Sequence, residues 1–85
     1  MKESMLNDKR LLAVDDEPDV LDSLEEIVKA EAPRCTVCKA RSYEEAMRFL
    51  GEADFDLVVL DIMGVRGFEL LEEAVRRGLR VAMLT

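Results

Sequence analysis

The sequence predicts an α/β domain in which a doubly wound parallel sheet is covered by helices on both faces. Short continuous apolar runs, which are typical of strands buried on both sides, alternate strictly with segments whose apolar residues recur at helical spacing. This alternation favours right-handed crossovers between parallel strands. At 85 residues the chain has room for one domain at most. The predicted strands are Leu11–Val14, Thr36–Cys38, Phe55–Leu60 and Leu79–Leu84.

Composition and charge narrow the class of protein. Hydrophobic residues make up 49% and charged residues 36% of the chain, which indicates a globular domain and not a disordered one. The formal net charge of -7 argues against nucleic-acid binding by this segment, because phosphate backbones are held mainly by Lys and Arg. No apolar run reaches the roughly 18 residues that span a bilayer, and Met1–Arg10 is too polar for a signal peptide. We therefore expect a cytoplasmic protein with no membrane contact.

The first half of the chain contains a leader, a strand and a helix. Residues 1–10 are a polar leader, expected to be frayed over Met1–Lys9. The first strand ends at Asp15 and Asp16, and Pro18 suits the first turn of the helix that follows. The predicted apolar face of that helix consists of Val20, Leu21, Leu24, Ile27 and Val28.

Two further helices are marked by signals at their ends. Ser42 and Glu45 fit a capping box at the start of the second helix, and Gly51 supplies a C-terminal stop. The third helix is predicted over Phe68–Arg77, with Gly78 as its C-terminal cap.

Cys35 and Cys38 form a C-x-x-C pair, a spacing found in redox motifs and zinc sites. In extended chain their Cα atoms would be about 10 Å apart, beyond the roughly 7 Å that a disulfide tolerates. The sequence has no histidine and no second cysteine pair, so one chain cannot assemble a closed zinc site. A structural role for both cysteines is the better interpretation.

Acidic residues follow the first and third strands, at the edge where open parallel sheets bind ligands. If these strands are neighbours, Asp15 and Asp16 face Asp61 across this edge. Clustered carboxylates repel one another, and hard oxygen ligands in an open pocket favour Mg²⁺. Asp61 would then be a nucleophile that accepts a phosphoryl group, and Thr85, ending the fourth strand, could donate a hydrogen bond to it. The alternative is that Asp15 or Asp16 only caps the helix at Pro18.

Four segments together resemble the receiver domain of bacterial two-component response regulators: Leu11–Pro18, Asp56–Met63, Gly67–Leu71 and Val81–Thr85. The resemblance implies a flavodoxin-like fold with strand order 2-1-3-4. It also implies Asp61 as phosphoacceptor, Asp15 and Asp16 as Mg²⁺ ligands with the Met63 backbone carbonyl, and Thr85 as the switch hydroxyl. The phosphoryl donor in this phosphorelay would be a sensor histidine kinase or a phosphotransfer protein. A homodimer is left open.

The chain also departs from this family's pattern. It ends before the fifth strand and that strand's lysine, so residues 11–85 are expected to be a partial receiver domain without the last α/β/α elements. The loop after Asp61 is shorter than usual and lacks the family's proline.

Two other functions compete with a phosphorylated receiver. One is a binding module of the same fold that is never phosphorylated. The other is a Mg²⁺-dependent phosphohydrolase, but that class typically carries Asp-x-Asp, whereas Asp15 and Asp16 are adjacent. We therefore do not expect an enzyme.

Overall fold

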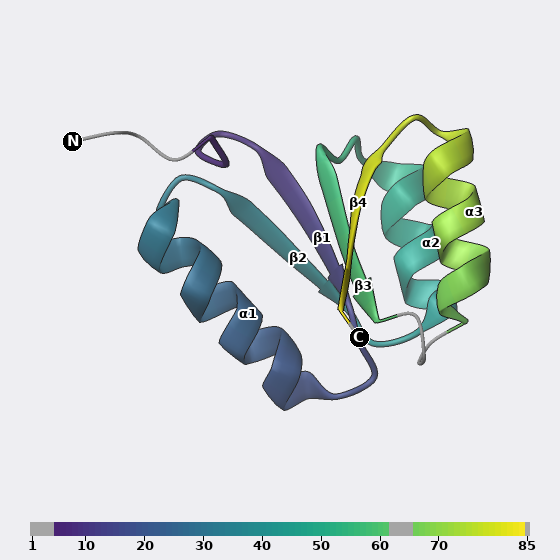
Figure 1. The fold of residues 1–85 in the computed structure, drawn as a ribbon, viewed down its shortest axis with the longest axis horizontal. Coiled ribbons are helices and arrows are strands. Elements are labelled where there is room, and N and C mark those ends of the chain that lie inside the picture. Colours follow the sequence, from purple (N-terminus) through teal and green to yellow (C-terminus); the bar gives the residue numbers. More distant parts are fainter. Residues whose placement is uncertain (1–4, 62–65, 85) are drawn as a thin grey trace.

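The computed structural model of the chain describes residues 5–61 and 66–84, and these residues form one four-stranded sheet with three helices (Figure 1). All strand pairs are parallel and the order is β2-β1-β3-β4, which confirms the predicted fold class and strand order. The elements are β1 (Arg10–Val14), α1 (Pro18–Glu31), β2 (Thr36–Ala40), α2 (Tyr43–Glu52), β3 (Leu57–Asp61), α3 (Gly67–Arg76) and β4 (Arg80–Leu84).

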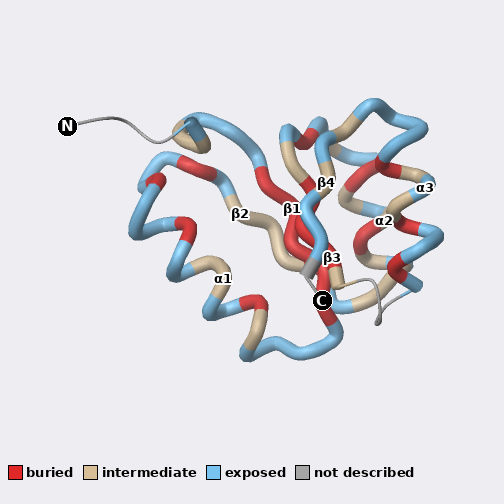
Figure 2. Tube along the Cα trace, viewed as in Figure 1, coloured by how far each residue is buried: buried red, intermediate tan, exposed pale blue. Residues whose placement is uncertain are grey.

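The helices divide unevenly between the two faces of the sheet. Helix α1 covers one face, and α2 and α3 lie together on the other (Figure 1). Buried residues gather along β1 and β3 in the middle of the sheet (Figure 2). The core on the α2/α3 side consists of Leu12, Val14, Ala40, Ala46, Leu50, Phe55, Val58, Leu60, Leu70 and Ala74. The core on the α1 side consists of Leu11, Ala13, Leu21, Val28, Ala32, Cys35 and Val59.

The burial of β1 on both faces of the sheet explains why its sequence is an unbroken apolar run. Leu12 and Val14 point to the α2/α3 side, while Leu11 and Ala13 point to the α1 side, and none of the four is more than 2% exposed. Successive side chains of a strand alternate between the faces of a sheet, so a strand covered on both faces needs apolar residues at every position.

The residues before β1 are more ordered than the sequence predicted. The Asp8 carboxylate accepts a hydrogen bond from the Arg34 guanidinium at 3.0 Å, and the Thr36 N–H donates to the Lys9 carbonyl at 2.9 Å. Leu6 packs against the α1-side core. The expectation of a frayed leader is therefore wrong for Leu6–Lys9, because the register of β1 with β2 brings these residues beside the α1–β2 connection.

The predicted cap of α2 by Ser42 is confirmed, but the return bond from Glu45 goes to Arg41, the residue before the cap. The Glu45 N–H donates to Ser42 Oγ at 3.1 Å, and the Glu45 carboxylate reaches back to accept from the Arg41 N–H at 2.7 Å. The contact with Ser42 satisfies a backbone donor that the first turn of a helix leaves unpaired. The contact with Arg41 ties the chain just before the cap to the same turn.

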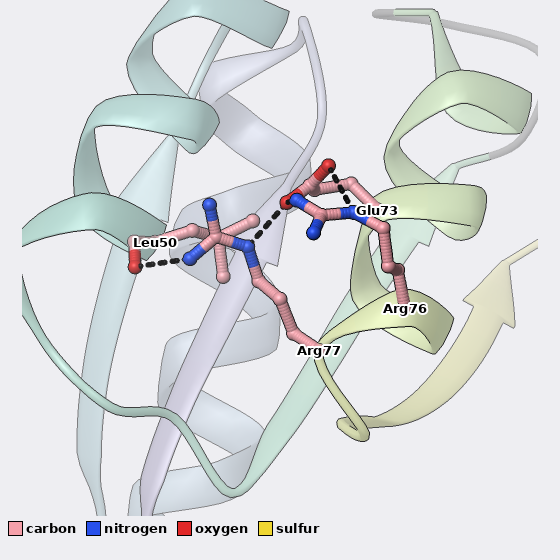
Figure 3. Close-up of polar contacts among 4 residues, drawn as sticks. All are labelled: Leu50, Glu73, Arg76 and Arg77. Atoms are coloured by element: carbon pink, nitrogen blue, oxygen red, sulfur yellow. Dashed lines mark hydrogen bonds and ion pairs between the residues drawn. The ribbon is translucent and has the colours of Figure 1, made fainter.

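The predicted stop at Gly51 is wrong, because α2 continues through this glycine to Glu52, and Ala53 is its C-cap residue. One reason for this longer helix is a contact from the residue that follows α3. The Arg77 guanidinium, just past the end of α3, donates to the Leu50 carbonyl at 2.9 Å (Figure 3). Glu73 holds that guanidinium at 2.5 Å. The end of α2 thus receives a cation that its own last turn lacks, a favourable partner for terminal carbonyls.

The end of α3 follows its prediction. Gly78 has φ +76°, a left-handed conformation that glycine adopts without a steric penalty. The Gly78 N–H donates to the Val75 carbonyl at 3.0 Å, and the Leu79 N–H donates to the Ala74 carbonyl at 2.9 Å. This pair of bonds is a Schellman motif, so Gly78 is confirmed as the cap of α3.

The two cysteines are free thiols that lie on opposite faces of the sheet. Cys35 is completely buried in the α1-side core, and this burial raises the pKa of its thiol. Cys38 packs against the core on the α2/α3 side. Both positions agree with the structural role expected from the sequence.

Candidate functional site

The acidic residues at the carboxyl edge of the sheet are placed by the pairing of β1 with β3. These strands are parallel neighbours, and their last paired residues are Val14 and Leu60. Asp15 follows Val14 directly, and Asp61 follows Leu60 as the last residue of β3. Because the strands are parallel and in register, Asp15 and Asp61 lie side by side at one edge. This is the adjacency of the first and third strands that the sequence analysis assumed.

Asp15 is held firmly by the backbone around it. Asp15 is only 5% exposed, and its backbone N–H donates to the Ala40 carbonyl of β2 at 3.1 Å. Its Oδ1 accepts the Glu17 N–H at 2.9 Å, in the turn that leads into α1. The alternative considered from sequence, that Asp15 or Asp16 caps the helix at Pro18, is wrong, because the N-cap residue of α1 is Glu17 and no side chain makes a capping hydrogen bond there. Asp15 instead holds the N–H of that N-cap residue. A carboxylate has further acceptor positions, so this contact leaves a metal-binding role open.

Asp16 and Asp61 have different surroundings. Asp16 is exposed, whereas Asp61 is half-buried and pairs through its backbone with Leu84 of β4. On the β4 side Asp61 itself is paired, whereas on the β1 side the pairing ends one residue earlier, at Leu60. The predicted ligand Met63 and the predicted switch residue Thr85 lie outside the described residues.

The donor set at this edge fits a hard divalent cation. Carboxylate oxygens are the ligands that Mg²⁺ prefers in proteins, usually together with several waters. Asp16 and Asp61 could bind such an ion directly, and Asp15 through its remaining acceptor positions. Over residues 5–61 and 66–84, the structure contains no preassembled group of three or more acidic or cysteine side chains around a metal position. The sheet brings the acids to one edge, but it does not close them around a common point.

A surface hollow lies at the opposite end of the strands. It has a volume of about 530 Å³ and is lined by Met5, Leu6, Lys9, Asp56, Leu57 and Arg80. Leu57 and Arg80 are the first residues of β3 and β4, so this hollow is remote from the acidic edge. It therefore contributes nothing to the candidate site.

Sequence reasoning missed one contact at the start of α3. Arg66 precedes α3, on the connection that leaves Asp61, and its backbone is left-handed with φ 56°. Its guanidinium stacks on the ring of Tyr43, the first residue of α2. No periodic pattern or motif marks this contact, because it joins residues from two helices that only the tertiary fold brings together.

Comparison with known proteins identifies the class to which this fold and acidic edge belong. Residues 11–85 match the family described as the response regulator receiver domain, and the chain belongs to this family. It is therefore a receiver domain of the two-component type.

A similar solved structure is the crystal structure of the response regulator protein TrrA from Thermotoga maritima in complex with Mg²⁺-BeF. The TM-score is 0.74 at 32% identity, and the alignment covers 88% of this chain and 65% of TrrA. The chain thus spans less than two thirds of that relative. Among curated protein sequences, no match was found. In the part of the chain that the structure describes, no helix has the length and apolar character needed to cross a bilayer.

Proposed function

We propose that this receiver domain accepts a phosphoryl group on Asp61 in a Mg²⁺-dependent reaction, with a sensor histidine kinase or a phosphotransfer protein as donor. The observation that carries the proposal is the register of β1 with β3, which sets Asp15 and Asp61 side by side at the carboxyl edge of the sheet. Membership of the receiver family supports it, as does the Mg²⁺-BeF complex of the similar protein TrrA.

The chemistry follows from the charges at this edge. A carboxylate oxygen of Asp61 would attack the phosphorus of the donor, forming an acyl phosphate. The bond from phosphorus to the histidine nitrogen breaks, and its electron pair leaves with the imidazole. Bound Mg²⁺ would offset the negative charge that gathers on the phosphoryl oxygens. Asp16 is exposed and Asp15 is fixed by the turn into α1, so these two residues would hold the ion beside Asp61.

The consequence would be a signalling switch and not catalytic turnover. A modified Asp61 alters the charge at the point where the chain leaves β3, and a domain with two packed states would respond by a shift in their populations. The chain itself is therefore proposed not to be an enzyme. The cytoplasmic location and the absence of nucleic-acid binding stay predictions from sequence.

Incubation with acetyl phosphate and Mg²⁺, followed by intact-mass measurement, tests the proposal. We expect the wild-type chain to gain the mass of one phosphoryl group, and Asp61→Asn to gain none. Asp54→Asn is the matched control, because Asp54 is an exposed aspartate in the connection before β3, and this variant should be labelled like the wild type. Chelation of Mg²⁺ should abolish labelling of both the wild-type chain and Asp54→Asn. A folded wild-type chain whose mass stays unchanged would instead favour the binding module that is never phosphorylated.

The predicted metal ligand Asp16 has a test of its own. Replacing its carboxylate by an amide removes one negative ligand, so Asp16→Asn should need at least about tenfold more Mg²⁺ for half-maximal labelling. A dependence on Mg²⁺ identical to that of the wild type would exclude Asp16 from the metal site.

A further inference from the structure

The carboxyl edge of the sheet carries more negative charge than one Mg²⁺ would neutralise. All four parallel strands end at this edge (Figure 1), where Asp15, Asp16 and Asp61 place three carboxylates. A Mg²⁺ ion supplies only two positive charges, and a phosphoryl donor such as acetyl phosphate is itself an anion. The edge would therefore still repel its substrate, because like charges raise the free energy of close approach. A further cation at this edge would offset that repulsion.

Arg41 is the described basic residue whose position suits that cation. It follows Ala40, the last residue of β2, and the Ala40 carbonyl accepts the backbone N–H of Asp15 at 3.1 Å. This bond continues the β1–β2 ladder beyond its last registered pair, Val14 with Ala40. Arg41 therefore lies next to Asp15, and Asp15 lies between Arg41 and Asp61. With strands about 4.8 Å apart, the backbones of Arg41 and Asp61 are about 10 Å apart, which an arginine side chain and a phosphoryl group span together.

The backbone of Arg41 is fixed, whereas its side chain is exposed. Its N–H donates to the Glu45 carboxylate at 2.7 Å, which ties this residue to the first turn of α2. Within residues 5–61 and 66–84, the Arg41 guanidinium takes part in no ion pair or hydrogen bond. An anion that approaches the edge from solvent therefore meets a guanidinium that no carboxylate has engaged.

The other described cations at this end of the sheet already have carboxylate partners. Lys39 is bound to two carboxylates of α1, at 3.0 Å and 2.8 Å. The guanidinium of Arg66, which precedes α3, is bound to Glu69. The remaining described basic residues lie toward the other end of the strands or further along α2. In the described part of the chain, Arg41 is thus the one cation at this edge that a substrate need not take from a carboxylate.

We propose that Arg41 binds the phosphoryl group of the donor and guides it to Asp61. A guanidinium presents several N–H donors in a planar fork that fits the oxygens of a phosphoryl group. Its positive charge also draws the anionic donor toward the edge, an effect that weakens as salt increases. Arg41 thereby acts on the approach and binding of the donor, while the transfer itself takes place at Asp61. This inference rests on the proposed function of Asp61.

The rate of Asp61 labelling by acetyl phosphate tests this role in a series of charges at position 41. At low ionic strength and saturating Mg²⁺, Arg41→Lys keeps the charge and should be labelled within about twofold of the wild-type rate. Arg41→Gln removes the charge and should be labelled about fivefold more slowly, and Arg41→Glu reverses it and should be labelled about 25-fold more slowly. At about 1 M salt, which screens charges beyond about 3 Å, the four rates should converge to within about threefold.

Arg80→Gln is the matched control for net charge. Arg80 is exposed and begins β4, at the opposite end of the sheet from Asp61. This variant loses the same charge as Arg41→Gln, but far from the edge, so it should be labelled within about twofold of the wild-type rate. Urea unfolding completes the comparison, because the midpoint of Arg41→Gln should match that of the wild type. A merely structural role for Arg41 would instead lower the urea midpoint and leave the slowing independent of salt.

Three results would overturn the inference. Labelling of Arg41→Gln and Arg41→Glu at the wild-type rate would remove the role of Arg41 while leaving the proposed function of Asp61 intact. Equal slowing in Arg41→Gln and Arg80→Gln would show that net charge sets the rate and that no contact at this edge is needed. A folded wild-type chain that is not labelled at all would refute both the proposed function and the role of Arg41.

Discussion

The two faces of the sheet hold their helices in different ways. Helix α1 is alone on its face and buries only Leu21 and Val28 fully, while Ile27 remains 64% exposed. Its polar ties run to β2 and the residue before it. Lys39 contacts Asp22 at 3.0 Å and Glu25 at 2.8 Å, and the Lys29 ammonium donates to the Cys35 carbonyl. Helix α1 thus depends on the sheet and on the residue before β2, with no second helix beside it on that face (Figure 1).

Helices α2 and α3 depend on each other as well as on the sheet. They share one core, and an arginine joins them at each end, Arg66 at the start of α3 and Arg77 after its last turn. The acidic edge connects the two faces, because Asp15 and Asp16 lead into α1 whereas Asp61 leads toward α3. A change at this edge therefore affects both α1, which packs alone on its face of the sheet, and α3, which packs beside α2.

The largest effects should come from truncating the main anchors, Leu70 on α3 and Leu21 on α1, each 2% exposed. Leu70→Ala and Leu21→Ala should each cost about 2–5 kcal/mol of unfolding free energy, through lost burial and the cavity left behind. Leu21→Ala should also speed hydrogen exchange in α1 more than elsewhere, because only Val28 then remains fully buried on that helix. Urea unfolding and hydrogen exchange measure both. Equal acceleration across all three helices would break the comparison between the faces.

A smaller pair of opposite effects should distinguish the ends of α2 and α3. Gly78→Ala places a side chain at φ +76° and should cost about 1–2 kcal/mol. Gly51→Ala lies inside α2, where an added Cβ meets no atom within 4 Å, and it should stabilise the domain by about 0.5–1 kcal/mol. Thermal or urea unfolding measures both variants. Destabilisation by Gly51→Ala would contradict the finding that α2 runs through this glycine.

The smallest effects should appear at the extremes of pH, with opposite signs for the two faces. Hydrogen bonds from Arg77 and Arg76 lower the pKa of Glu73, so the stability it adds is complete above its unfolded pKa and is lost as pH falls through the lowered value. Hydrogen bonds to Glu25 and Asp22 raise the pKa of Lys39. Its contribution is complete below its unfolded pKa and is lost as pH rises through the raised value.

Urea midpoints measured across pH test this opposition. Glu73→Gln should flatten the acid side of the stability profile, and Lys39→Gln should flatten the alkaline side. Both groups remain partly exposed and solvent screens their charges, so each change should be small. If Glu73→Gln altered only the alkaline side, the assignment of the acid-sensitive contact to the α2/α3 face would be wrong.

Much of the fold could be predicted because local signals and burial agree. The apolar run of β1, the helix cap at Ser42 and the cap at Gly78 each depend on residues close in sequence, and all three are confirmed. The stop predicted at Gly51 failed for the opposite reason. A glycine in a helix is only a weak local signal, and the contact of Arg77 with the end of α2 comes from another helix.

The candidate site divides in the same way. The sequence by itself determined that carboxylates follow two buried strands, because the change from apolar to acidic residues at Asp15 and Asp61 is visible in the chain. Only the tertiary structure decided that β1 and β3 are neighbours in register, that Asp15 accepts a hydrogen bond in the turn into α1, and that Arg66 stacks on Tyr43. The physical reason is that strand order and cross-helix contacts join residues far apart along the chain, whereas periodicity and capping report only on near neighbours.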